Sequence, residues 1–137
     1  MTNHDLLRRI DRNLSYIRER RPLSPQEGKE LDAYYKIGTT YSSNALEGNT
    51  LTISETKVIL EDGLTVGGKP IRDCYEAVGH GKAYDYMLSL ARSEQLCVTE
   101  EMVHRLHYLF YSGIEPDHAG NYRDCQVFIT GTAYIPP

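Results

Sequence analysis

The amino-acid sequence predicts a mainly α-helical fold with one β-hairpin at its C-terminal end. Two observations support this prediction. Up to Gly113, most apolar residues recur at spacings of three and four, which is the period of helices that bury one face. From Cys125 onward the pattern changes to an alternation of apolar and polar residues around Thr130-Gly131-Thr132, which is typical of two short strands joined by a turn.

Length and composition define the class of protein. The chain has 137 residues, 40% of them hydrophobic and 25% charged, which is ordinary for one soluble globular domain. A formal net charge of −4 argues against a nucleic-acid partner bound through a broad basic face. No apolar run is long enough to span a bilayer and no signal segment is recognisable, so we expect no membrane partner. The three cysteines are odd in number and widely spaced, which favours reduced thiols in the cytoplasm.

The first two helices have clear boundaries. The first, within residues 1–22, ends at a proline. The second, within residues 24–48, begins with a capping box in which Ser24 and Glu27 satisfy each other's backbone N–H groups. It ends at Gly48, because glycine readily adopts the left-handed conformation that stops a helix.

Three further helices are predicted within residues 52–113. Thr52 and Glu55 form another capping box, and Thr99 caps the last of the three helices. The sequence Gly-His-Gly-Lys-Ala, residues 79–83, falls inside the longest helix, where small residues permit close packing against a neighbouring helix. The predicted ranges are residues 52–63, 71–93 and 99–113.

Two motifs suggest chemistry but are better explained by structure. Gly63 to Lys69 has most of the spacing of a phosphate-binding loop, but Pro70 stands where a magnesium-binding Ser or Thr is needed and a helix precedes the loop. Glu101, His104 and His107 share a helix in a Glu-x-x-His-x-x-His pattern. A di-metal bundle requires two Glu-x-x-His copies and further carboxylates, so a partly exposed helix face is the preferred interpretation.

The end of the second predicted helix, Ser43-Asn-Ala-Leu-Glu47-Gly48, resembles the inhibitory motif Ser/Thr-x-x-x-Glu-Gly/Asn of the Fic family of protein AMP-transferases. The resemblance continues through "EGNTLTISETKVIL", "GKPIRDCYEAVGHGKAYDYM" and "AGNYRDCQVFITGTAYIPP", and it covers residues 38–137 in the family's order. It implies a Fic-like helical fold with an inhibitory helix over residues 24–48. Residues 125–137 would then be the β-hairpin known as the flap.

The resemblance also implies a function for the intact protein. Fic enzymes transfer AMP from ATP, held with Mg²⁺, to a Ser, Thr or Tyr hydroxyl of a protein target. Ser43, Glu47 and Gly48 would be the regulatory motif, in which Glu47 competes for the arginine that binds the γ-phosphate. The flap edge would accept the protein target as an extended strand. The flap residues that would face target or nucleotide are Ile129, Thr130, Gly131, Thr132 and Tyr134.

One departure from the family pattern limits this expectation. The catalytic loop, His-x-Phe-x-Asp/Glu-Gly-Asn-Gly-Arg-x-x-Arg, does not occur in these 137 residues. We therefore expect the N-terminal part of a single Fic domain, without catalytic or metal-binding residues and inactive alone. ATP and Mg²⁺ would serve the intact enzyme and would not bind this part tightly. The predicted helix over residues 71–93 would be covered by the missing catalytic segment or by self-association.

Three alternatives remain open at this stage. Glu47 could serve AMP removal, because some family members run the reaction in reverse. The chain could be a non-catalytic Fic-derived module that binds or inhibits another Fic protein. A metal-free helical bundle without such a role is the third possibility, in which Ser43 and Glu47 belong to an ordinary exposed helix end.

Overall fold

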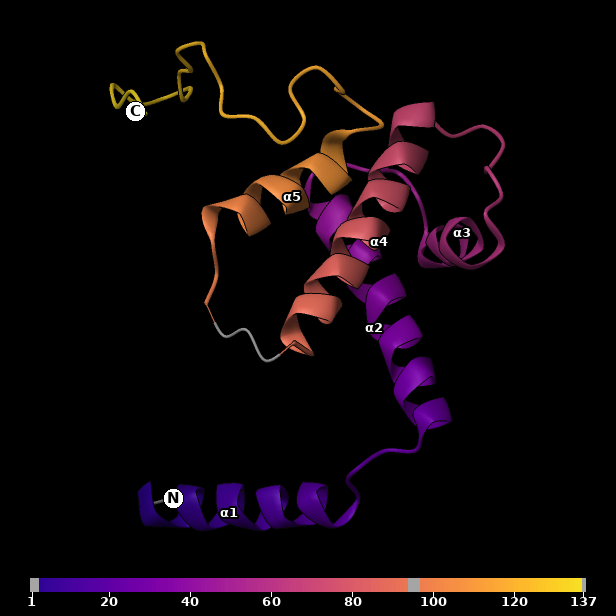
Figure 1. Cartoon of the computed structure of the whole chain (residues 1–137), viewed down its shortest axis with the longest axis vertical. Helices are drawn as coiled ribbons and strands as arrows, with labels where there is room; N and C mark the ends of the chain where they lie inside the picture. Colours follow the sequence, from indigo (N-terminus) through magenta and orange to yellow (C-terminus); the bar gives the residue numbers. More distant parts are fainter. Residues whose placement is uncertain (1–2, 94–96, 137) are drawn as a thin grey trace. The chain divides into compact units, whose positions relative to one another are not determined.

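The computed structural model describes residues 3–93 and 97–136, and this part of the chain is mainly helical (Figure 1). The mainly α prediction is confirmed, whereas the described residues contain no β-strand. No helix in residues 3–93 and 97–136 has both the length and the apolar character needed to cross a membrane. The elements are α1 (Asn3–Glu19), α2 (Pro25–Leu46), α3 (Ile53–Lys57), the π-helical turn η1 (Val58–Asp62), α4 (Ile71–Ala91) and α5 (Glu100–Tyr111).

The predicted helix starts are formed as expected. At α2, the Glu27 N–H donates to Ser24 Oγ at 3.2 Å, and the Ser24 N–H donates to Glu27 Oε2 at 2.8 Å. Hydrogen bonding of the Glu27 carboxylate with the side chain and the backbone N–H of Ser24 holds the pKa of Glu27 below its usual value, because it favours the ionised form. Thr52 and Glu55 make the same reciprocal pair at α3, and the Thr99 side chain accepts the Met102 N–H at α5.

The chain divides into two compact units after Tyr35, and we describe each by itself. The prediction of a single domain over residues 1–137 therefore stays a prediction. The first unit contains α1, none of whose residues is buried. Its apolar stripe remains exposed: Leu7 and Ile10 are each 59% exposed, and Ile17 is 49% exposed.

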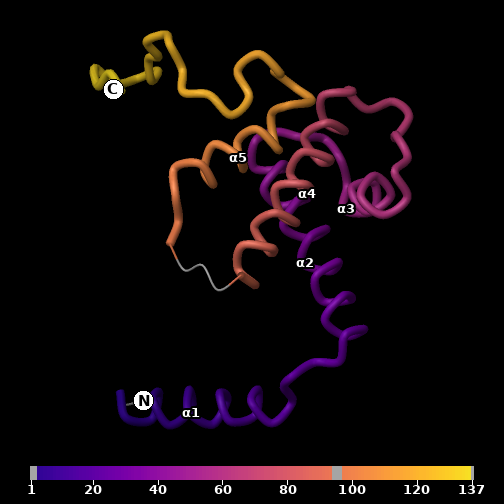
Figure 2. The backbone as a smooth tube through the Cα atoms, in the orientation of Figure 1, coloured from indigo at the N-terminus to yellow at the C-terminus, as the bar shows by residue number. Residues whose placement is uncertain are grey.

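The second unit has a small core around α4. Leu51, Ile59, Cys74 and Ala77 are buried together, with Val66 and Val78 packed against them. Figures 1 and 2 show α4 and α5 side by side. Cys74, Cys97 and Cys125 are all free thiols.

Glycine makes the close approach of α4 to its neighbours possible. A Cβ atom at Gly79 would overlap the Phe110 carbonyl group of α5. A Cβ at Gly81 would lie 2.6 Å from Leu60 Cδ2 of η1. The prediction that the small residues of this helix permit close packing is confirmed.

The predicted β-hairpin over residues 125–137 is not supported, since the described residues 121–136 form no strand. Only the turn at its centre is present: the Thr132 N–H donates to the Ile129 carbonyl at 3.3 Å, and Gly131 has φ +85°. Residues 121–135 are all exposed, and Figure 2 shows them as an irregular trace. An isolated two-stranded ribbon is marginal in water, because nothing buries either of its faces.

Candidate functional site

The end of α2 is closed by a regular hydrogen-bonding motif. The Gly48 N–H donates to the Ala45 carbonyl at 3.2 Å, and the Asn49 N–H donates to the Asn44 carbonyl at 3.0 Å. With Gly48 at φ +92°, this is a Schellman motif, which satisfies carbonyls that a helix end would otherwise leave unpaired. The predicted stop at Gly48 is confirmed. Glu47 lies at the cap position, immediately after the last helical residue.

Glu47 presents its carboxylate to solvent. The residue is exposed, and no hydrogen bond or ion pair reaches this carboxylate within residues 3–93 and 97–136. The negative pole of α2 disfavours a carboxylate at this position. The structure therefore holds Glu47 on a fixed backbone while leaving its side chain available to a group outside the described residues. Ser43 is half-buried one turn earlier, and it is Ser42 whose hydroxyl donates back to a helix carbonyl, that of Thr39.

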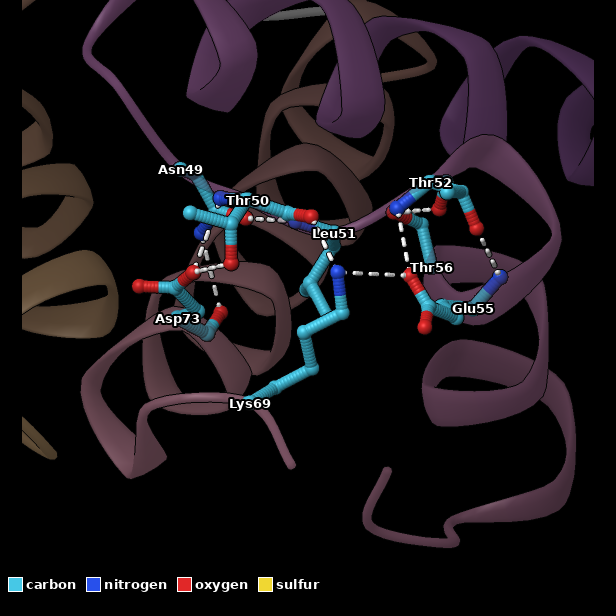
Figure 3. Close-up of polar contacts among 8 residues, drawn as sticks. All are labelled: Asn49, Thr50, Leu51, Thr52, Glu55, Thr56, Lys69 and Asp73. Carbon is cyan, nitrogen blue, oxygen red and sulfur yellow. Dashed lines mark hydrogen bonds and ion pairs between the residues drawn. The ribbon is translucent and has the colours of Figure 1, made fainter. Parts of the chain in front are cut away.

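The residues after Glu47 are held by the first turn of α4 (Figure 3). Asp73 is only 8% exposed, and its Oδ2 accepts the Thr50 N–H at 2.8 Å and the Thr50 hydroxyl at 2.6 Å. Asn49 Nδ2 donates to the Asp73 carbonyl at 3.1 Å and to Glu76 Oε2 at 2.9 Å. Bonds to an ionised acceptor are stronger than neutral ones, so Asp73 is the main anchor of this loop.

Lys69 also contacts this loop (Figure 3). Its ammonium donates to the Thr50 carbonyl at 2.5 Å and lies 3.3 Å from Glu55 Oε2. Glu55 also accepts the Thr52 N–H at 2.7 Å, and this backbone bond is the main cause of its lowered pKa. Lys69 is therefore paired with two groups of the protein, which agrees with a structural interpretation of the glycine-rich loop before it.

Together these contacts form what we call the loop anchor: Asn49, Thr50, Glu55, Lys69, Asp73 and Glu76. Within it, the backbone N–H groups of Asn49, Thr50, Leu51 and Thr52 all have partners. A segment with satisfied backbone groups on two sides has little freedom to move. The anchor therefore fixes the direction in which the end of α2 presents Glu47.

The buried side of α2 carries two further polar groups. Thr40 is fully buried, and its hydroxyl lies 2.9 Å from His80 Nδ1 of α4. The ring of His80 is half-buried and packs edge-on against Phe110, and this burial lowers the pKa of His80. Asn44 is 5% exposed, and its Nδ2 is buried without a hydrogen-bond partner in the described chain.

The predicted flap residues lie apart from this arrangement in the sequence and are not drawn together into a site. Ile129 is 50% exposed and Tyr134 is 61% exposed, and the Tyr134 N–H donates to Thr132 Oγ1 at 3.1 Å. Thr130 and Gly131 form the turn. The roles predicted for these five residues stay predictions.

A cavity of about 620 Å³ lies beside α5, at the start of the segment that leads to the flap residues. Arg72 of α4, His104 and His107 of α5 and Tyr122 contribute to its lining. His104 Nδ1 bonds to the Gly120 carbonyl, and the Gly120 N–H donates to His107 Nδ1 at 2.8 Å. The two histidines of the Glu-x-x-His-x-x-His pattern thus use one ring nitrogen each to hold a loop. Among the described residues, no group of three His, Cys, Asp or Glu side chains is arranged to hold a metal ion.

Sequence reasoning missed the loop anchor and the contacts of Gly120. Asp73 had a local signal, because an acidic residue in the first turn after Pro70 is typical of a helix start. Its partner Thr50, however, lies 23 positions earlier in the chain. No periodic pattern identifies a pair at that separation.

Comparison with known proteins agrees with this architecture. A protein adenylyltransferase Fic of Nematostella vectensis is 34% identical over 106 residues, which are 77% of this chain and 24% of the relative. The protein adenylyltransferase fic-1 of Caenorhabditis briggsae is 32% identical over 98 residues, covering 71% of this chain and 19% of the relative. The solved Fic-1 structure from C. elegans superimposes with a TM-score of 0.68 at 25% identity, covering 87% of this chain and 38% of that one. No protein-family model matches the chain.

The helical fold is that of a Fic-type protein. The chain belongs to the Fic family, as its curated relatives and structural neighbour show. It spans a quarter or less of the length of the curated relatives just described, 24% and 19%.

Proposed function

We propose that this chain is the regulatory and target-binding part of a Fic-type protein adenylyltransferase, with Glu47 as the inhibitory residue. The observation that carries the proposal is the presentation of Glu47: a fixed backbone holds an exposed carboxylate for which the described residues provide no partner. A carboxylate held in this way is suited to a bidentate pair with an arginine. In the proposal, that arginine belongs to the catalytic loop and otherwise binds the γ-phosphate of ATP.

The transfer chemistry itself would need residues that the described chain does not provide. No metal-binding group is present among the described residues, and the Fic catalytic loop does not occur in the sequence. ATP and Mg²⁺ are therefore proposed as ligands of the intact enzyme. The protein target is proposed as the ligand of residues 125–137, which would gain strand structure when a second strand pairs with them.

The first experiment tests whether this chain transfers AMP without the catalytic loop. The purified 137-residue chain is incubated with labelled ATP and Mg²⁺, with and without an added Fic catalytic domain. We expect no label transfer by the chain alone. Robust transfer by the chain alone would contradict the proposal, because it would place the catalytic groups within these residues.

The second experiment tests Glu47 in a protein that carries both this chain and the catalytic loop. Replacing Glu47 by Gly removes the competing carboxylate, so we expect auto-AMPylation to increase at least tenfold, the equivalent of losing about 1.4 kcal/mol of inhibitory interaction. Glu61→Gly, at another exposed glutamate, is the matched control and is expected to leave activity unchanged. Unchanged or lower activity in Glu47→Gly would argue against inhibition; a loss of AMP removal would instead favour the reverse reaction.

The alternative is a non-catalytic module that binds another Fic protein. The exposed carboxylate of Glu47 would then pair with an arginine of the partner. Size-exclusion chromatography of the chain with a catalytic Fic protein distinguishes the two functions. A stable complex that inhibits the partner and depends on Glu47 would favour the alternative.

A further inference from the structure

We propose that His104 and His107 form a clamp on Gly120 that positions the segment leading to the flap residues. The two histidines lie one turn apart on α5 and hold opposite polar groups of the same residue. His104 Nδ1 bonds to the carbonyl of Gly120, and the N–H of Gly120 donates to His107 Nδ1 at 2.8 Å. Both backbone hydrogen-bonding groups of Gly120 are therefore held by side chains of one helix.

The directions of these bonds determine two different imidazole tautomers. A carbonyl oxygen only accepts, so His104 must carry a proton on Nδ1. A backbone N–H only donates, so His107 Nδ1 must be unprotonated, and its neutral ring carries the proton on Nε2. Gly120 thus fixes two neighbouring histidines of the same helix in different tautomers, Nδ1–H for His104 and Nε2–H for His107.

Gly120 is suited to this contact because it has no side chain. Its φ of +78° is in the left-handed region that favours glycine. A Cβ atom at this position would lie 2.9 Å from Tyr108 Cβ and 3.3 Å from the His104 carbonyl oxygen. The backbone of the loop therefore lies directly against α5, at the distance that both imidazole bonds require.

The clamp lies where the buried part of the chain ends. Ala119 is 6% exposed and is the last buried residue of the described chain. Tyr122 extends the attachment: its hydroxyl donates to Glu100 Oε1 at 2.9 Å, and its ring packs edge-on against His104 at 4.6 Å. From Arg123 to Ile135 the chain is exposed. The direction in which these residues leave the helical body is consequently set at Gly120 and Tyr122.

Protonation affects the two halves of the clamp differently. A second proton on His107 would occupy Nδ1 and place a donor opposite the Gly120 N–H, so this bond would be lost. A second proton on His104 would occupy Nε2, which lies 3.7 Å from Glu100 Oε1, and would leave its Nδ1 donor in place. The bond between Gly120 and His107 is therefore the one that requires a neutral ring.

Titratable and charged groups from three parts of the chain line the cavity that His107 also lines. On α5, the Tyr111 ring stacks on the His107 ring with centroids 4.7 Å apart, and His104 lies one turn away. Arg72 of α4 lines the same cavity. The segment after α5 adds six charged or titratable groups: Glu115, His118, Tyr122, Arg123, Asp124 and Cys125.

The clamp is tested directly on the ¹⁵N-labelled 137-residue chain. Long-range ¹H–¹⁵N spectra of the imidazoles near pH 7.5 are expected to show the Nδ1–H form for His104 and the Nε2–H form for His107. Finding both rings in the same tautomer, or both averaging between the two forms, would overturn the clamp. This measurement needs no substitution and therefore does not depend on how a variant folds.

Hydrogen exchange separates positioning from general stability. His107→Ala should increase exchange of the Gly120 amide about tenfold, because its acceptor is lost. His107→Asn keeps an acceptor close to the position of Nδ1 and should restore most of the protection. Equal protection in His107→Ala and the wild type, or an unprotected His107→Asn, would contradict the clamp.

The positioning role in AMP transfer rests on the proposed function. In a protein that also carries the catalytic loop, His107→Ala should raise the KM for the protein target with little change in the KM for ATP, and His107→Asn should restore it. An unchanged target KM would overturn this role. Absence of AMP transfer by the wild-type protein would refute the proposed function instead, and the NMR results would still decide whether the clamp exists.

Discussion

Two segments of this protein begin at a left-handed glycine, one at the end of α2 and one in the loop that follows α5, but they are held very differently. After α2, Gly48 leads into the loop anchor, in which four successive backbone N–H groups from Asn49 to Thr52 have partners. After α5, Gly120 is clamped by His104 and His107, and the chain beyond Tyr122 is exposed as far as Ile135.

The difference follows from where acceptors and donors are available. The first segment runs past the start of α4, where Asp73 and Lys69 supply an acceptor and a donor. The second is held by side chains of α5: His104 and His107 bond to Gly120, and Tyr122 donates to Glu100. A fixed segment suits a regulatory carboxylate, which must be presented in one direction. An exposed segment suits the binding of different extended peptides, since its backbone can pair with the backbone of a bound peptide along its length.

The largest effect is expected from Gly79→Ala, because it disturbs the contact between α4 and α5 that supports both segments. The added methyl group would overlap the Phe110 carbonyl, and backbone cannot give way as a flexible side chain can. We expect a loss of about 3 kcal/mol of unfolding free energy, at the upper end of overpacking effects. Chemical denaturation monitored by circular dichroism measures it.

Gly38→Ala provides the control for this variant. Gly38 also lies inside a helix, but a Cβ there would meet nothing within 4 Å. Because alanine is the better helix former, we expect equal or higher stability, by up to about 1 kcal/mol. Equal losses in the two variants would show that the close approach of α4 and α5 is not what makes Gly79 necessary.

Asp73→Ala is expected to have the next largest effect and to act on the first segment alone. It removes the shared acceptor of the Thr50 N–H and hydroxyl, which should cost roughly 2 kcal/mol. Amide exchange at Thr50 should increase, whereas exchange at Gly120 should stay unchanged. Asp62→Ala, an exposed aspartate at the end of η1, serves as the control. Loosening at both Thr50 and Gly120 would indicate that the two segments are one cooperative unit.

The structural features that could be predicted from the sequence are those that depend on residues close together in the chain. The capping boxes at Ser24 and Thr52 and the stop at Gly48 need partners only three to five positions away, and all of them are formed. The close packing at Gly79 could be predicted because a glycine inside a helix costs stability unless a neighbour needs the space. The exposed position of Glu47 follows from the same local stop.

The features that could not be predicted depend on contacts with distant parts of the chain. The alternation in residues 125–137 indicates strands only if some surface covers one face, and residues 121–135 are exposed throughout the structure. The loop anchor could not be foreseen, because Asp73 and Lys69 reach Thr50 across 23 and 19 positions. The His104–Gly120 bond spans 16 positions and also escapes local reasoning.

A pH titration of stability examines the contact between α2 and α4 beneath the first segment. Burial lowers the pKa of His80 below its unfolded value of about 6.5, so the unfolded chain binds more protons in the window below that value. The contribution of neutral His80 to the free energy of unfolding is fully present above about pH 6.5. It is lost as the pH falls towards the lowered pKa of His80 in the folded state. We expect His80→Gln to flatten this part of the stability profile, and His4→Gln, at an exposed histidine of α1, to leave it unchanged. A profile unaffected by His80→Gln would show that other groups dominate this pH range.

The smallest effect is expected from a matched pair of asparagines at the end of α2. The Nδ2 of Asn44 is buried without a hydrogen-bond partner among residues 3–93 and 97–136, whereas the Nδ2 of Asn49 donates to the Asp73 carbonyl and to Glu76. Leucine at position 44 removes an unpaired polar group and should raise the unfolding free energy by about 1 kcal/mol. The same change at position 49 removes satisfied bonds and should lower it.

Thermal and chemical denaturation of Asn44→Leu and Asn49→Leu, compared with the wild type, measure both signs. Opposite signs would show that polar groups near Glu47 stabilise the chain only where they join the loop anchor. A loss of stability in Asn44→Leu as well would show instead that the Asn44 amide has a partner in solution, such as a bound water. In that case the buried side of α2 would also be held near its end, through the Asn44 amide. The end of α2 and the segment after Gly120 would then differ in how firmly they are held by more than the hydrogen bonds between protein groups indicate.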